Sequence, residues 1–313
     1  MKKLICLMLC FVLGLTFCAC AQTQGKDHNI SIVCASFAEY DWVKNLTQGT
    51  SAKVTILADT GTDMHSYQPT AADVLAIGKA DLVVYNGGTA DGWMTSAVKN
   101  SGFKGKSVRL MDVLGDRLLH LSADHQDEHH HGEACEYDEH TWLSLKNAVI
   151  ACQKISKALI SVDAANEKAY TQNCTDYVQK LKQLDADYTD LVAKAKTKSV
   201  VIADRFPFVY LLSDYGLKWQ AAYEGCSSET DADFEKVLSL AKWVDKEGIS
   251  TLFIIEGGTD NLAKTVVSNT KGKNQQILTL DSMQSVTKKD IDGGKTYLSA
   301  MAQNLDNLKI ALN

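Results

Sequence analysis

The feature that most constrains the fold is a run of about 35 residues, 162–197, without glycine or proline. Apolar side chains recur along it at helical spacing, which predicts one long amphipathic helix. A helix of this length would extend roughly 50 Å at 1.5 Å per residue. Such a helix is a rigid spine between two parts of the chain. The apolar positions are Tyr170, Cys174, Tyr177, Leu181, Leu184, Tyr188 and Leu191.

Short β-branched runs alternate with amphipathic stretches on both sides of this spine. Before it, the predicted strands are ISIVCASF, AKVTIL, DLVVYNG and KSVRLM, with helices at DWVKNLTQ and TAADVLAIGKA. After it, the predicted strands are SVVIAD, LKWQAAYEG, STLFIIEGG and QILTLDS. Strands separated by helices favour parallel sheets. We therefore predict an α/β protein whose N-terminal lobe, 30–161, and C-terminal lobe, 198–313, each have a mainly parallel sheet, flanking helices and a separate core.

The N-terminus predicts export. Residues 1–19 combine two lysines with a short apolar run and read as a signal peptide. Cys20 follows the small Ala19 as in a lipoprotein processing site, so we expect lipidation at Cys20, a linker over 20–29 and an extracytoplasmic protein anchored to the membrane. Cleavage by an ordinary signal peptidase nearby is the alternative.

Charge and cysteine content narrow the function. The net charge of −6 becomes about −8 without the two leader lysines, which disfavours nucleic acid and favours cations. No CxxC pair indicates a thiolate zinc site. Besides Cys20, five cysteines remain, and their pairing stays open: Cys34, Cys135, Cys152, Cys174 and Cys226.

Six of the 8 histidines fall within 21 residues, mixed with carboxylates and without lysine or arginine. Imidazole and carboxylate groups together suit borderline divalent cations such as zinc. We expect a solvated, disordered loop, 120–139, that collects metal as an accessory. Cys135 could add a soft ligand, although a plain free thiol is the simpler interpretation. The predicted accessory ligands are His120, His125, His129, His130 and His131.

Other candidate ligands stand just after predicted strands, where open α/β sheets bind their ligands. His65 follows a strand of the first lobe. His140 precedes Trp142 and Leu143, whose burial would fix its position. The alternatives are a surface histidine for His65 and helix caps for the acids. The acids that follow strands of the second lobe are Asp204, Glu224, Glu256 and Asp281.

Four segments resemble the metal-binding components of bacterial zinc and manganese ABC importers. GTDMHSYQP is similar to the family's first signature, which supplies a histidine ligand at His65, and DEHTWL to the second, which supplies His140. FPFVYLLSDYGL is similar to the segment after the third ligand, and LTLDS to the strand end that gives the fourth, Asp281. The likeness covers nearly the whole mature chain, including an acidic His-rich loop typical of the zinc branch.

The chain departs from the family pattern at three positions. Met64 and Glu139 stand where the family has proline, which costs turn rigidity and removes no ligand. Arg205 stands where the family has a third ligand, and a guanidinium has no lone pair for a metal. We expect Asp204 to take this role, or to pair with Arg205 instead. Other candidates are Glu224, Glu229, Glu256 or a water molecule.

The resemblance implies a binding protein and not an enzyme. It would hold Zn²⁺ between the lobes through His65, His140, Asp281 and Asp204, a set that tetrahedral zinc accepts. Mn²⁺ accepts the same donors, and the His-rich loop favours zinc. The implied partners are a permease and its ATPase, with the chain itself a monomer. Because the spine resists bending, we expect only a small closure on metal binding.

Two other functions compete with zinc delivery. One is a manganese importer component that also acts as an adhesin, a role attributed to this family. The other is a zinc metallohydrolase, which would need an open metal position and a poised base. The sequence has no HExxH motif, which argues against hydrolysis.

Overall fold

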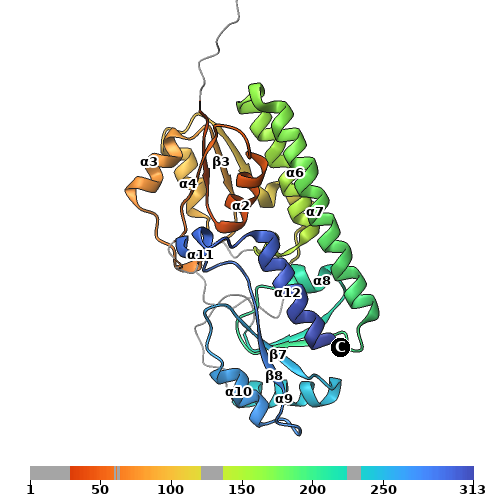
Figure 1. The fold of residues 1–313 in the computed structure, drawn as a ribbon. Helices are drawn as coiled ribbons and strands as arrows, with labels where there is room; N and C mark the ends of the chain where they lie inside the picture. Colours follow the sequence, from red (N-terminus) through yellow and green to blue (C-terminus); the bar gives the residue numbers. More distant parts are fainter. Residues whose placement is uncertain (1–28, 60, 62–63, 121–136, 224–233) are drawn as a thin grey trace, which may run out of the picture.

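The computed structural model describes residues 29–59, 61, 64–120, 137–223 and 234–313. Figure 1 shows two lobes placed one above the other beside a pair of long helices. Each lobe contains one four-stranded sheet, and every strand pairing is parallel. The predicted α/β class with two parallel sheets is confirmed. None of the helices in the described ranges is both long and apolar enough to cross a membrane.

The first lobe has the strand order β2-β1-β3-β4. The chain crosses from β1 outwards to β2 and then back past β1 to β3, so the carboxyl ends of β1 and β3 form the crevice where such sheets bind ligands. Its strands are β1 (Ser31–Cys34), β2 (Lys53–Ile56), β3 (Leu82–Tyr85) and β4 (Lys106–Arg109). Its helices are α2 (Phe37–Leu46), α3 (Ala71–Lys79), α4 (Trp93–Asn100) and α5 (Leu110–Leu114).

The second lobe repeats this topology with the order β6-β5-β7-β8. All four of its strands occur where the sequence predicts them. They are β5 (Ser199–Ile202), β6 (Lys218–Ala221), β7 (Thr251–Ile255) and β8 (Gln276–Leu280). The helices that follow β5, β6 and β7 are α8 (Val209–Asp214), α9 (Phe234–Glu247) and α10 (Asn261–Ser268).

The spine consists of α6 (Leu145–Val162) and the long helix α7 (Glu167–Lys194). At 28 residues α7 is roughly 42 Å long, shorter than the sequence predicts. Most of the difference lies at the start, where Asp163 ends α6 and accepts hydrogen bonds from Asn166 Nδ2 at 2.7 Å and Tyr170 Oη at 2.6 Å. These bonds stabilise a 3₁₀ turn, Ala164–Asn166, ahead of α7.

One hydrophobic core extends through both lobes and the spine. In β1, Ile32 and Cys34 face this shared core, whereas Val33 faces a smaller cluster on the outer side of the sheet. In β5, Ile202 faces the shared core and Val201 faces a second outer cluster. Successive strand residues point to opposite faces, so each sheet serves two clusters. The expectation of separate cores is therefore wrong, because buried residues of both sheets, of α6 and α7 and of the C-terminal helix, residues 297–312, belong to one continuous cluster.

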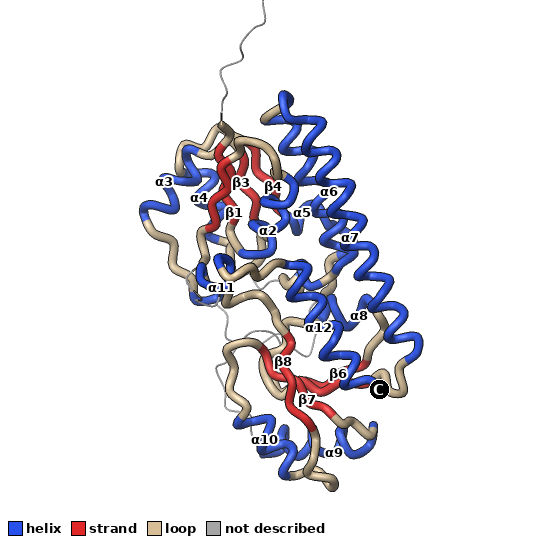
Figure 2. Tube along the Cα trace, in the orientation of Figure 1, coloured by secondary structure: helices blue, strands red, loops and turns tan. Residues whose placement is uncertain are grey.

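The chain returns from the second lobe to the first after β8. We call residues 281–296 the return segment; it contains α11 (Lys288–Asp292) and leads into α12 (Tyr297–Leu312). The backbone N–H of Lys288 donates to Asp59 O in the first lobe at 2.6 Å. On α12, Tyr188 Oη of the spine donates to Met301 O at 2.7 Å. In Figure 2 the return segment and α12 run between the two sheets, so the lobes are joined by more than the spine.

Candidate metal centre

His140 is held rigidly at the start of the spine. Its ring is buried, with 4% of the side chain exposed, and its Nδ1 lies 3.0 Å from Asp138 Oδ1. The same oxygen accepts the backbone N–H of His140 at 2.9 Å. With Asp138 ionised, its oxygen can only accept, so in the neutral imidazole Nδ1–H donates to it and Nε2 carries the lone pair that a metal needs. The Trp142 ring stands edge-on at 5.4 Å and fixes the ring plane.

His65 lies in a 3₁₀ turn, Met64–Ser66, in the connection after β2. Tyr67 anchors this connection by donating from Oη to Asp73 Oδ2 at 2.9 Å and to Leu57 O at 3.2 Å. The His65 side chain is 26% exposed, and its Nδ1 lies 3.6 Å from Glu139 Oε1. The His65 and His140 ring centroids are 5.8 Å apart, at an interplanar angle of 49°. The structure thus brings together the two imidazoles that the sequence singled out.

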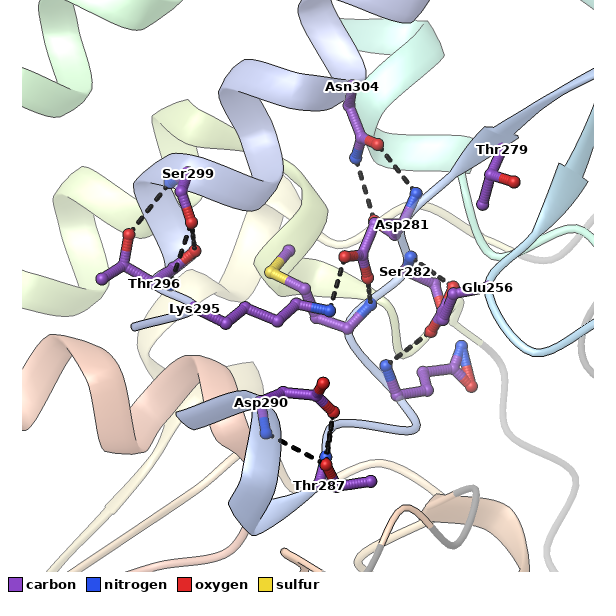
Figure 3. A network of polar contacts seen from close by, with 12 residues as sticks. Glu256, Thr279, Asp281, Ser282, Thr287, Asp290, Lys295, Thr296, Ser299 and Asn304 are labelled. Atoms are coloured by element: carbon purple, nitrogen blue, oxygen red, sulfur yellow. Dashed lines mark hydrogen bonds and ion pairs between the residues drawn. The ribbon is translucent and has the colours of Figure 1, made fainter. Parts of the chain in front are cut away.

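Asp281 stands at the end of β8, as predicted, but its carboxylate is engaged. Oδ2 lies 2.6 Å from Lys295 Nζ, and Oδ1 accepts the N–H of Met283 at 2.9 Å. The side chain of Asn304 binds the backbone N–H and C=O of Asp281, at 2.7 and 2.9 Å. Figure 3 shows Lys295 reaching across the return segment to this carboxylate. A metal at Asp281 would compete with the lysine ammonium for this carboxylate.

Glu256, at the end of β7, shapes the return segment. Its carboxylate accepts hydrogen bonds from Ser282 N at 2.7 Å, Ser282 Oγ at 2.6 Å and Gln284 N at 3.1 Å, as Figure 3 shows for Ser282. Burial and the neighbouring Asp281 carboxylate raise the pKa of Glu256, whereas the hydrogen bonds from Ser282 oppose this rise. Glu256 therefore acts here as an anchor for the loop that carries Asp281.

Asp204, at the end of β5, also bonds to backbone. Oδ1 accepts the N–H of Arg205 at 2.8 Å, and Oδ2 accepts the N–H of Ile255 at 3.3 Å. A Cβ on Gly258 would come within 2.3 Å of Oδ2, so glycine is needed there for Asp204 to fit. Asp204 thus joins the ends of β5 and β7.

Several predicted sites lie outside the described residues: Cys20, His125, His129, His130, His131, Glu224 and Glu229. His120 is described, and it forms an antiparallel bridge with Tyr137 at the base of the His-rich loop, with rings 4.5 Å apart. Cys34, Cys152 and Cys174 are buried free thiols, and burial raises the pKa of each. Cys135 and Cys226 are outside the described residues.

The second lobe contacts the segment that carries His140. Tyr210 Oη donates to Asp138 O at 2.8 Å and accepts the N–H of Leu119 at 3.1 Å. Trp142 Nε1 donates to Ser282 O in the return segment at 2.9 Å. These bonds place His140 at the junction of the lobes. Trp142, two residues after His140, is hydrogen-bonded to Ser282, the residue after Asp281.

Sequence reasoning missed the polar residues that support the histidines. Asn86, after β3, donates to Glu139 O at 2.7 Å and accepts Thr141 Oγ1 at 2.6 Å, which holds the turn around His140. Nearby, burial and the Glu39 carboxylate raise the pKa of Asp91 to about 8. The sequence signal that could have revealed the supporting residues is the pair of carboxylates, Asp138 and Glu139, directly before His140. Together these groups line a cavity of about 10 Å³, formed by Ser36, Asn86, Ala90, Asp91, Glu139 and Trp142.

Within the described ranges, no three histidine, cysteine, aspartate or glutamate side chains converge in a geometry that could hold a metal ion. The pair His65 and His140 is therefore the part of the predicted site that the structure assembles. Two imidazoles whose Nδ1 atoms face carboxylates form half of a zinc-type ligand set.

The chain is similar to zinc-binding proteins along its whole length. It is 31% identical to the zinc-binding lipoprotein AdcA of Streptococcus pneumoniae over 313 residues, 99% of this chain and 61% of that protein. It is 28% identical to the high-affinity zinc uptake system protein ZnuA of Bacillus subtilis, over 97% of this chain and 95% of that protein. The chain thus spans about three fifths of the first of these relatives.

A solved structure gives the same result. The Zn(II)-bound ZnuA-like domain of S. pneumoniae AdcA matches 91% of this chain and 99% of that domain, with a TM-score of 0.73 and 28% identity. The family model described as zinc-uptake complex component A, periplasmic, matches residues 32–311. A match of this extent, on a fold with the same two lobes, establishes that the chain belongs to the ZnuA family.

Proposed function

We propose that the chain captures Zn²⁺ outside the cytoplasm and delivers it to a membrane permease driven by a cytoplasmic ATPase. Family membership and the zinc-binding relatives support this function. The observation that carries it is the approach of His65 and His140 to a ring separation of 5.8 Å at the lobe junction. Imidazole nitrogen is a preferred zinc ligand, at about 2.0 Å.

The two histidines supply Nε2 ligands, and carboxylates of the second lobe complete the site. Asp281 is the first of these, after it exchanges the Lys295 ammonium for the metal. Asp204 is the second, and it can bind metal through the remaining lone pairs of its hydrogen-bonded oxygens. Glu224, Glu229 and Glu256 are the alternatives. Of these three, only Glu256 lies in the described part of the chain, and three donors already use its oxygens.

The chain has no catalytic task in this proposal. A metallohydrolase needs a metal-bound water and a base beside it. Among the described residues, the carboxylates of Asp138 and Glu139 contact the imidazoles, and they face the two Nδ1 atoms, where they orient the rings. The site is therefore suited to hold and release an ion, with the His-rich loop as an accessory collector.

The setting of this function follows from the leader. Cys20 carries a lipid that holds a monomer at the outer face of the cell membrane, where the permease and its ATPase are the partners and nucleic acid is not. Labelling the expressed protein with a radioactive or clickable fatty acid tests the anchor: wild type takes up label, and Cys20→Ala does not. Label retained by Cys20→Ala would assign lipidation elsewhere.

Competitive titration of zinc and manganese into residues 21–313 tests the metal assignment. We expect one tight zinc site that manganese displaces poorly. It should survive deletion of residues 122–136 and His28→Ala, a histidine of neither predicted set, and disappear in a His65→Ala/His140→Ala double variant. Tight binding that leaves with the loop, or manganese that competes equally, would contradict the proposal. Activity towards ester, peptide or phosphate substrates would favour the hydrolase instead.

A further inference from the structure

The carboxylate of Glu139 lies between a backbone donor and the ring of His65. Oε2 accepts the N–H of Ala90 at 2.8 Å. Oε1 lies 3.6 Å from His65 Nδ1, within ion-pair range. The Glu139 side chain is 10% exposed, so little water competes for either oxygen. Each oxygen therefore faces a different nitrogen.

The chain is built to place this side chain. A Cβ on Gly88 would come within 2.2 Å of Glu139 Oε2 and 2.4 Å of its Cβ, so the glycine leaves the space that Glu139 fills. The backbone oxygen of Glu139 accepts Asn86 Nδ2 at 2.7 Å and the N–H of Thr141 at 2.8 Å. Proline at position 139 would stiffen the turn, and here hydrogen bonds to Asn86 hold it instead. The position is thus available for a functional side chain.

Two neighbouring carboxylates face the two histidines, Asp138 at hydrogen-bond distance and Glu139 at the longer distance of an ion pair. Asp138 Oδ1 contacts His140 Nδ1 at 3.0 Å, and Glu139 Oε1 approaches His65 Nδ1. A carboxylate on Nδ1 selects the tautomer whose Nε2 carries the lone pair, and it makes that nitrogen a stronger ligand. Because residues 138–140 are contiguous, a single turn sets the orientation of both rings.

We propose that Glu139 is a positioning residue for zinc capture, which orients the His65 imidazole and fixes its Nδ1–H tautomer. This role rests on the proposed function of the two histidines. Glu139 occupies the place where the resemblance gives proline, so the departure adds a second carboxylate–histidine pair to the one made by Asp138.

Glu139→Gln is the sharpest variant, because it keeps the size and removes one acceptor. The single amide oxygen would stay on Ala90 N–H, so an uncharged NH₂ group in place of a carboxylate oxygen would face His65 Nδ1. We expect zinc affinity to fall about 10-fold, as for outer-shell partners of metal ligands. Glu167→Gln, the same change on an exposed residue at the start of α7, should leave affinity unchanged.

A double-variant cycle separates positioning from general destabilisation. If Glu139 acts through His65, Glu139→Gln should have no further effect on zinc affinity in a His65→Ala background. An equal loss in both backgrounds would overturn the proposal.

Ring ¹⁵N chemical shifts of His65 in the metal-free protein give a readout that does not depend on zinc. We expect the Nδ1–H tautomer in wild type and a tautomer mixture in Glu139→Gln. Identical shifts in the two proteins would overturn the role of Glu139, even if zinc binds tightly. Absence of zinc binding by wild type, with the predicted shifts present, would instead contradict the proposed function.

Discussion

The two lobes share one topology and differ in what their strand ends do. Both sheets have the same strand order, and both place polar residues just after their strands. In the first lobe the connections bring His65 and His140 together, with Nδ1 atoms turned to carboxylates. In the second lobe Asp204 and Glu256 bind backbone N–H groups, and Asp281 binds Lys295. A repeated fold can thus assign ligand orientation to one lobe and loop anchoring to the other.

The largest effect should come from breaking the first lobe's pair. His65→Ala removes a nitrogen ligand from a partly exposed ring, and we expect zinc affinity to fall on the order of 100-fold, more than for any outer-shell change. Calorimetric titration measures this loss, and an unchanged thermal unfolding temperature of the metal-free variant serves as its control. A reduction smaller than that of Asp281→Asn would reverse the comparison.

The lobes also differ in how they contact the spine. On the first lobe, Tyr177 Oη of α7 donates to the buried Asp41 carboxylate at 3.0 Å, whereas Tyr188 donates to a neutral carbonyl near the second. Burial raises the pKa of Asp41 to about 6, against opposing hydrogen bonds. The folded protein therefore retains a proton on Asp41 that the unfolded chain releases near pH 4.

It follows that this group's contribution to stability is fully present below about pH 4 and is lost as the pH rises to about 6. Asp41→Asn should remove this dependence, which is worth about 3 kcal/mol. The measurement is urea unfolding of wild type and Asp41→Asn at several pH values between 4 and 7. The difference between their free energies of unfolding is compared across these pH values. Parallel pH profiles would show that Asp41 does not titrate in this window.

In the second lobe, Lys295 occupies the carboxylate of the predicted ligand Asp281. It neutralises Asp281 at 2.6 Å, and both side chains are about one fifth exposed, at 23% and 19%. If zinc must displace the ammonium, Lys295→Met should raise zinc affinity roughly five-fold, the equivalent of about 1 kcal/mol. Lys289→Met, which changes an exposed lysine of α11, is the matched control. Weaker zinc binding by Lys295→Met would mean that the ion pair supports the site.

The smallest expected effect is a change in the overall shape of the protein when zinc binds. The shared core and the return segment join both lobes to the spine, so zinc binding should leave the relative position of the lobes nearly unchanged. Small-angle scattering of metal-free and zinc-loaded protein should give superposable curves. A clear decrease in radius of gyration on zinc addition would indicate hinge closure and contradict the rigid spine.

Much of the fold could be predicted from the sequence because strand and helix periodicities are local. All eight strands occur within the segments that the sequence predicts as strands, and α7 lies within the Gly- and Pro-free run. The start of α7 was misplaced, because the side-chain bonds of Asp163 decide it. The shared core was missed, because which face of a strand meets the spine depends on contacts between distant segments.

The candidate site was predictable only in its histidines. His65 and His140 stand out by motif, and the structure brings them together. Lys295 lies 14 positions beyond Asp281, and nothing local marks it as the partner of that carboxylate. In the sequence, Glu139 is notable only because the family has proline at this position. Its contacts with Ala90 N–H and His65 Nδ1 depend on the space left by Gly88 and on the fold of the first sheet.

The central claim is that zinc binds between the two imidazoles. A crystal structure of the zinc-loaded protein, with anomalous data collected at the zinc edge, tests it most directly. We predict one strong anomalous peak at about 2.0 Å from Nε2 of both His65 and His140, with Asp281 turned away from Lys295. A peak bound by only one of these histidines, or located in the His-rich loop, would contradict the account.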